Sequence, residues 1–255
     1  MDPDIEELFA PIAPSAAFGV VLSEAQDVLA HVREPIDAEL WGSDMLGALS
    51  RSAGEGTDLM GELAASLVPA AEEAATPEAL ALLRVLGALG SAQLRKTSNQ
   101  SAERIKASGI ADPSWASELG TPKPGACWHY SDVNGQQESV TATFAYSARE
   151  HALSVLIDHN HGGRIRDAWV SDASGLLDKT WLAAENDPGV LFEKIGVADA
   201  GERLRRAVSA GEAPQKPDEA DDITAHRALL HSRVALLISN TLTLPPLSPD
   251  APASS

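Results

Sequence analysis

The order of hydrophobic and polar residues divides the chain into a helical part, a β part and a second helical part. Between Ala16 and Val32 apolar residues recur with the period of a helix that buries one face. The same period predicts further helices over residues 36–49, 59–67, 77–89 and 92–107. Thr76, Pro77 and Glu78 strengthen one of these predictions, because a side-chain cap, a proline and an acid are typical of a helix start.

The hydrophobic period shortens to two in the middle of the chain. Val140, Ala142, Phe144 and Tyr146 alternate with more polar residues, which predicts a half-buried strand. Asn134-Gly135 just before it is a strong signal for a hairpin turn. Further strand-like runs predict a four-stranded antiparallel β-meander at about residues 126–171, with strands near 126–130, 138–146, 151–158 and 164–171.

Helical patterns return after the meander. We expect a helical stretch that begins at Ser174 and includes Leu182, and helices from Val190 to Ile195 and from Ala200 to Ala210. The predicted fold class is therefore α+β, with a helical N-terminal region, the meander and a helical C-terminal region. The predicted divisions are a helical region at 1–111, the meander with its following helices at 112–211, an acidic linker at 212–222, a C-terminal helix at 223–242 and a disordered tail at 243–255.

Charge and composition narrow the classes of function. The formal net charge of −18 repels a phosphate backbone, so a nucleic-acid partner is unlikely. Cys127 is the only cysteine, which removes any intrachain disulfide. The first residues lack the basic segment of a signal peptide, and no stretch reaches the ~18 apolar residues of a membrane span. We expect a cytoplasmic protein with no membrane contact.

The turn after the third predicted strand carries the best candidate chemistry. Asp158, His159 and His161 offer a carboxylate and two imidazoles that could bind a divalent metal ion. In that hypothesis Asp158, His159 and Asp167 are the catalytic groups, and a metal-bound water is the nucleophile of a hydrolase. The same residues also fit a purely structural turn, because Asp, Asn and Gly favour tight turns and a histidine beside them can bond the backbone.

An anion site is the third interpretation of this turn. Successive backbone amides around Gly162 and Gly163 could surround an anion, with Arg164 and Arg166 supplying positive charge. Asp132 and Glu138, which flank the first hairpin turn, could separately pair as acid and base. No Gly-x-Ser-x-Gly elbow, P-loop or Rossmann glycine pattern is present in the sequence.

Three functions follow from these observations. The leading hypothesis is a protein-interaction or regulatory module that binds a protein partner or a second copy of itself through the C-terminal helix at 223–242. The alternative is the metal-dependent hydrolase centred on Asp158-His159-Asn160-His161. A second alternative is a nucleic-acid-associated factor that uses two groups of arginines, namely Arg164 with Arg166 and Arg203 with Arg205 and Arg206.

Overall fold

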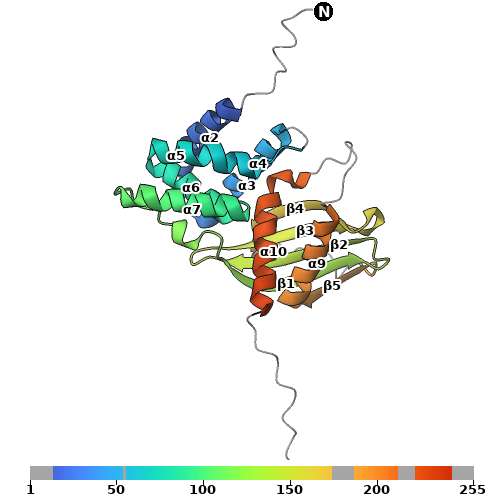
Figure 1. Ribbon diagram of the computed structural model, residues 1–255. Helices are drawn as coiled ribbons and strands as arrows, with labels where there is room; N and C mark the ends of the chain where they lie inside the picture. The colour runs from blue at the N-terminus through green and yellow to red at the C-terminus, as the bar shows by residue number, and fades with distance from the viewer. Residues whose placement is uncertain (1–13, 54–55, 174–186, 212–221, 243–255) are drawn as a thin grey trace, which may run out of the picture.

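The protein consists of a helical part beside an antiparallel sheet that carries two helices on one face (Figure 1). The computed structural model describes residues 14–53, 56–173, 187–211 and 222–242. The predicted α+β class is confirmed for these residues. The helical stretch expected from Ser174 to Leu182, residues 212–221 of the expected acidic linker and the tail at 243–255 lie outside the described residues.

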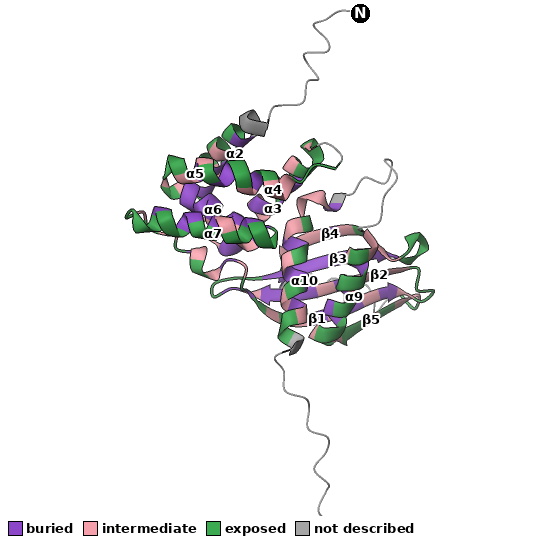
Figure 2. Cartoon of the chain, in the orientation of Figure 1, coloured by how far each residue is buried: buried purple, intermediate pink, exposed green. Residues whose placement is uncertain are grey.

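The helical part is assembled around one central helix. Its elements are α2 (Pro14–Leu29), α3 (Pro35–Ser52), α4 (Leu59–Glu62), a π-helical turn (Leu63–Leu67), α5 (Val68–Ala74), α6 (Pro77–Leu89) and α7 (Ala92–Ala107). Helix α6 begins where the sequence predicts, and the Thr76 hydroxyl accepts a hydrogen bond from the amide of Ala79 at 3.1 Å. Most of α6 is buried among α2, α3, α5 and α7 (Figure 2), so it forms the centre of this core.

The sheet has five strands, where the sequence analysis predicts four. They are β1 (Lys123–Asp132), β2 (Gln137–Ala145), β3 (Glu150–Asp158), β4 (Arg164–Asp172) and β5 (Val190–Ile195), in the spatial order β4-β3-β2-β1-β5 with all neighbours antiparallel. The four predicted strands are all present. Gly135, with a φ of 66°, forms the predicted turn between β1 and β2.

The prediction of a helix from Val190 to Ile195 is wrong, because this segment is the strand β5. It pairs along β1, which leaves β1 flanked on both sides. Asp187 and Pro188 resemble a helix start, but the Asp187 carboxylate closes a tight turn by accepting the amide of Gly189 at 2.8 Å. Six residues rich in β-branched and aromatic side chains are too few for a stable helix and suit an edge strand.

Helices α9 (Val197–Gly211) and α10 (Arg227–Leu242) lie side by side across one face of the sheet (Figure 1). A short 3-10 turn (Asp222–Ala225) precedes α10 and contacts α3 and β4. Buried side chains of β1 to β4, α9 and α10 form a second hydrophobic core, separate from that of the helical part. Within the described ranges, none of the helices has the length and apolar character needed to cross a membrane.

A buried ion pair connects the two parts of the molecule. Glu39 on α3 and Arg233 on α10 pair with side chains that are 0% exposed. The Glu39 carboxylate also accepts hydrogen bonds from the Tyr146 hydroxyl at 2.6 Å and from the amide of Gly120 at 2.7 Å. One carboxylate therefore holds together a helix of the helical part, the connector before the sheet, the end of β2 and the last helix.

Aromatic rings and a neutral histidine complete the surroundings of Arg233. Its guanidinium lies 5.4 Å from the ring centre of Phe144 and 5.8 Å from that of Tyr146, within the range of cation–π attraction. Burial lowers the pKa of His151 to about 3, so its ring stays neutral near pH 7. His151 Nε2 therefore accepts a hydrogen bond from Arg233 Nε at 3.3 Å.

We expect Arg233→Met to lower the free energy of unfolding by about 3–5 kcal/mol, because the charge of Glu39 would remain buried without its partner. The double variant Glu39→Gln/Arg233→Met removes that orphaned charge and should be more stable than Arg233→Met alone. Urea unfolding followed by circular dichroism measures both. A cost below about 1 kcal/mol for Arg233→Met would show that the pair does not connect the two parts.

Candidate functional site

The turn between β3 and β4 is closed by its own hydrogen bonds. Asp158 Oδ1 accepts the amide of Asn160 at 2.9 Å. The amides of Gly162 and Gly163 donate to the carbonyl oxygens of His159 and Asp158 at 3.3 and 3.0 Å, and both glycines have positive φ values of 81° and 74°. These two amides are therefore already bonded within the turn, and the structure does not present them as the anion nest expected around Gly162 and Gly163.

The two histidines of this turn point to different partners. His161 Nδ1 lies 2.9 Å from Asp158 Oδ2, whereas His159 Nε2 lies 3.2 Å from Glu138 Oε1 on the neighbouring strand β2. Asp167 lies on β4, opposite Leu156 of β3, and its carboxylate accepts a hydrogen bond from the amide of Ala168 at 2.8 Å. Of the predicted metal and catalytic residues, the structure pairs Asp158 with His161, but it directs His159 to Glu138 and does not pair Asp167 with any of them. Nowhere in the described ranges do three or more His, Cys, Asp or Glu side chains form a group suited to a metal ion.

Glu138 is the centre of the polar cluster that the structure does bring together. It lies on β2 with a side chain only 11% exposed, on the face that α9 and α10 cover. Its Oε2 atom accepts hydrogen bonds from His129 Nε2 at 2.9 Å and from Arg203 Nη1 at 2.8 Å. Together with His159 on Oε1, three cationic or imidazole groups from β1, the β3–β4 turn and α9 surround one carboxylate.

A signal in the sequence could have found this cluster. Glu138 precedes Val140 by two residues, so the alternation that predicts a buried face for Val140 also places Glu138 on that face. His129 stands in the same relation to buried Cys127, and it pairs with Val140 across the strands. A carboxylate and an imidazole on the buried face of neighbouring strands need hydrogen-bond partners, and here Glu138 and His129 bond to each other. Asp132, the predicted acid–base partner of Glu138, lies on the opposite face and bonds backbone amides of the hairpin turn.

The cluster fixes the charge of its central carboxylate. Hydrogen bonding to His129, with the nearby charge of Arg203, lowers the pKa of Glu138 to about 2. In return, hydrogen bonds to Glu138 and then to Glu193 raise the pKa of His129 above its ordinary value. Glu138 is therefore ionised throughout the neutral range. A general base works best with a pKa near the working pH, so Glu138 suits charge pairing better than proton transfer.

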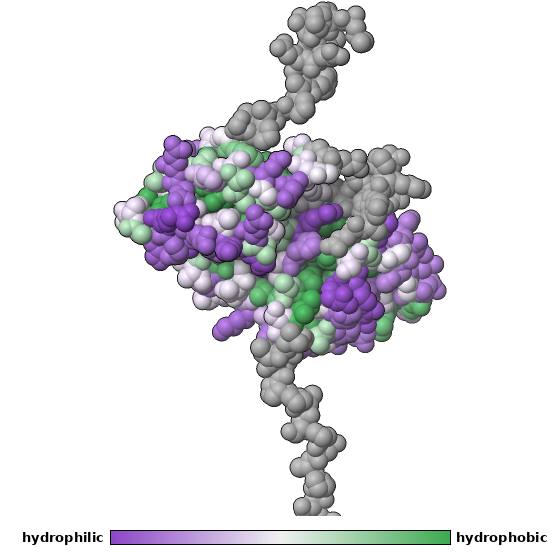
Figure 3. Space-filling view, in the orientation of Figure 1, coloured by the Kyte–Doolittle hydropathy of each residue, from purple (hydrophilic) through white to green (hydrophobic). Residues whose placement is uncertain are grey.

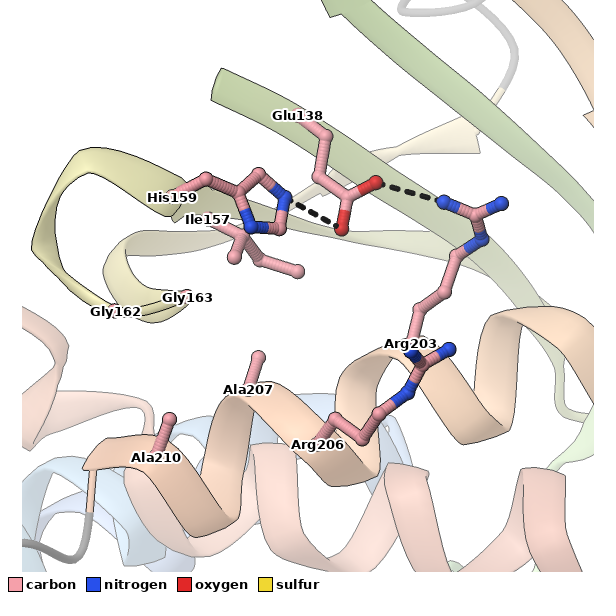
Figure 4. Close-up of a pocket in the computed structure, with 9 residues that line it drawn as sticks. All are labelled: Glu138, Ile157, His159, Gly162, Gly163, Arg203, Arg206, Ala207 and Ala210. Atoms are coloured by element: carbon pink, nitrogen blue, oxygen red, sulfur yellow. Dashed lines mark hydrogen bonds and ion pairs between the residues drawn. The ribbon is translucent and has the colours of Figure 1, made fainter. Parts of the chain in front are cut away.

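A cavity of about 320 Å³ lies beside this cluster. The β3–β4 turn forms one wall and α9 forms the other, and Figure 4 shows Arg203 extending from α9 to Glu138 while the Arg206 side chain lies along α9 beside it. The described residues that line the cavity are Glu138, Ile157, His159, Gly162, Gly163, Arg203, Arg206, Ala207 and Ala210. The lining therefore combines four charged or imidazole side chains with three apolar side chains and two glycines.

The arginines of the cavity are not those assigned to the predicted anion site. Arg164 and Arg166 lie on β4, on either side of the buried Ile165, and do not line the cavity. Arg203, predicted as part of a nucleic-acid surface, instead contacts Glu138 and Asp199. Arg205 forms a two-pronged pair with Glu202 at 2.9 and 2.8 Å, away from the cavity. Arg203 and Arg206 therefore line the cavity, whereas Arg205 does not.

The C-terminal helix is part of the folded core. Leu229, Leu230, Val234 and Leu237 of α10 are buried against α9, α3 and the sheet. A partner would have to displace this packing to reach the apolar face that motivated the interaction hypothesis. Leu236 and Ile238 are only partly buried, and Figure 3 shows hydrophobic surface along α10 between hydrophilic surfaces over α7 and α9.

The Glu138–His129 pair predicts how stability depends on pH. Glu138 has a lowered pKa, so its contribution is complete above about pH 4.5 and is lost as the pH falls toward 2. His129 has a raised pKa, so its contribution is complete below about pH 6.5 and is lost as the pH rises through the folded-state pKa. The pair should therefore stabilise the protein most between these two limits.

We expect Glu138→Gln to lower the free energy of unfolding by about 1–2 kcal/mol at pH 5.5, after allowance for solvent screening, and by less at pH 9. Urea unfolding at both pH values measures the difference. Glu73→Gln, the same change at an exposed position of α5, is the control and should have little effect at either pH. An equal cost of Glu138→Gln at pH 5.5 and pH 9 would contradict the pairing.

Comparison with known proteins does not identify a function for this chain. No protein-family model, curated protein or solved structure matches the chain. Any functional conclusion is therefore argued from the cavity and the residues that line it.

Proposed function

We propose that this protein is a regulatory binding module without catalytic activity, and that the cavity between α9 and the β3–β4 turn is its ligand site. The regulatory class is the one expected from the sequence, but the site moves from the C-terminal helix to the cavity. A cytoplasmic location belongs to the same proposal. The hydrolase and nucleic-acid alternatives gain no comparable support from the described residues.

One observation carries the proposal: the charged side chains beside the cavity are held in place by one another. Glu138 is bound by His129, His159 and Arg203, and Arg203 is held a second time by Asp199 at 3.1 Å. Side chains fixed in this way lose little conformational entropy when a ligand binds, which favours affinity.

The walls of the cavity fit the same purpose. Arg203, Arg206, Ala207 and Ala210 project from one side of α9, a rigid element that packs on the sheet and on α10. Gly162 and Gly163 allow the opposite wall to turn sharply, because both have positive φ values that other residues adopt at a cost. A rigid helix, a closed turn and an apolar floor at Ile157 form a largely preformed site, as small-molecule sites generally are.

Filling the cavity tests the proposal. Ala210 is half-buried and lines the cavity, so Ala210→Phe should occupy the space of the ligand. We expect native mass spectrometry to detect a bound small molecule on gently purified wild-type protein, or a metabolite panel to raise its melting temperature. Ala210→Phe should lose that binding, whereas Ser209→Phe, at an exposed neighbouring position outside the lining, should keep it.

Two results would contradict the proposal. One is a wild-type protein that carries no small molecule and is stabilised by no compound of the panel. The other is equal ligand binding by the wild type and Ala210→Phe.

A further inference from the structure

The hydrogen-bonding groups of the cavity are unbalanced. Glu138 is the one carboxylate among the described lining residues, and both its oxygens already accept hydrogen bonds or ion pairs from His129, His159 and Arg203. The other charged lining residues, Arg203 and Arg206, have side chains that only donate. A ligand that enters the cavity therefore meets donors and must itself supply acceptors.

Arg206 is the donor best placed to meet a ligand. Its side chain is 65% exposed, and both of its contacts to Glu202 within the described residues use Nε, at 3.3 Å to the carboxylate and 3.4 Å to the carbonyl oxygen. The two terminal nitrogens take part in neither contact. A guanidinium presents its donors in a planar fork that matches the spacing of oxygens in a carboxylate or phosphate.

Arg203 differs from Arg206, because Arg203 has two carboxylate partners, whereas Arg206 shares the single carboxylate of Glu202 with Arg205. Arg203 pairs with Glu138 at 2.8 Å and with Asp199 at 3.1 Å, and its side chain is only 27% exposed. Figure 4 shows the two arginine side chains next to each other above α9. Arg203 thus balances the charge of Glu138, which would otherwise repel an anion, and leaves Arg206 to attract one.

His159 supplies a second polar group on the opposite wall. Its Nε2 atom is directed to Glu138, while its Nδ1 atom faces Gly163, where a side-chain carbon would come within 3.6 Å. The glycine therefore keeps the space beside this nitrogen open. An imidazole nitrogen that faces open space can form a hydrogen bond with a ligand.

We infer that the ligand of this cavity is a compact anion, a carboxylate or a phosphate ester, whose charged group is bound by Arg206 and His159. The inference rests on the proposed function and names the chemical class of its ligand. A short apolar portion would contact Ile157, Ala207 and Ala210, the apolar residues of the lining. The volume of about 320 Å³ and the net charge of −18 both favour a small anion over a polyanion such as nucleic acid.

Three probes of similar shape separate the contributions: butyrate, butyl phosphate and the neutral amide butyramide. Isothermal titration calorimetry on the full chain at low ionic strength should detect binding of at least one anion and none of the amide. The two anions also separate a carboxylate ligand from a phosphate ligand.

Variants of α9 then locate the binding. Arg206→Gln should weaken binding of the anion about tenfold or more, and Arg206→Lys, which keeps the charge and loses the fork, should bind with intermediate strength. Arg205→Gln is the matched control, because it removes the same charge one residue away, from a side chain outside the cavity lining. Its affinity should fall by much less than that of Arg206→Gln, because Arg205 affects the site only through Glu202, which it shares with Arg206. A melting temperature near the wild-type value confirms that each variant is folded.

Several outcomes would overturn the inference. Equal weakening by Arg205→Gln and Arg206→Gln would mean that the anion responds to general charge and not to this site. If butyramide binds as strongly as butyrate, the ligand need not be an anion, and the inference is rejected. The proposed function would not be affected by that result. Absence of binding by all three probes to the wild type would also reject the anion, and the comparison of Ala210→Phe with Ser209→Phe would then decide the proposed function separately.

Discussion

The structure depends on the buried ion pair between Glu39 and Arg233. An unpaired charge in a protein interior is very costly, so neither residue tolerates the loss of the other. Because Glu39 belongs to the helical part and Arg233 to the last helix over the sheet, the pair makes two hydrophobic cores mutually dependent. It also fixes the position of α10, and α9 is packed against α10. The wall of the cavity is thus supported from the centre of the molecule.

The same chemistry recurs at Glu138, with a different consequence. Both carboxylates lie at the meeting point of several elements and accept hydrogen bonds from an arginine of α9 or α10. Glu39 is completely enclosed, so its interactions can only hold the fold together. Glu138 lies beside a cavity that solvent reaches, so the groups fixed around it are accessible to a ligand. Position relative to the surface separates the structural role from the binding role.

Local signals in the sequence predicted most of the elements. The helix start at Thr76-Pro77, the hairpin at Asn134-Gly135 and the four strands of the meander each depend on a few neighbouring residues, and the structure has all of them. The strand at Val190–Ile195 was missed, because its identity comes from pairing with β1 and not from its own pattern. Arg233 was also missed, since a single arginine on an apolar helix does not reveal that Glu39, far away in sequence, is its partner.

The candidate site was predicted only in part. The sequence analysis singled out the turn that carries His159, and this turn does form one wall of the cavity. It assigned the wrong companions, because Asp158 and His161 pair with each other and the glycine amides bond within the turn. Arg203 and Arg206 join the site through the packing of α9 on the sheet, which no local pattern contains. Glu138 and His129 were within reach, because strand alternation places both on the buried face.

The most direct test of the account is a nuclear magnetic resonance titration of the ¹⁵N-labelled full chain with butyrate and with butyl phosphate. The account predicts that saturable shift changes concentrate on the Nε–H signal of Arg206, the backbone amides of Gly162 and Gly163 and the ring of His159, which line one cavity. Signals of Arg205 should stay in place. Absence of saturable changes, or changes spread evenly over the surface arginines, would contradict the claim that this cavity is a binding site.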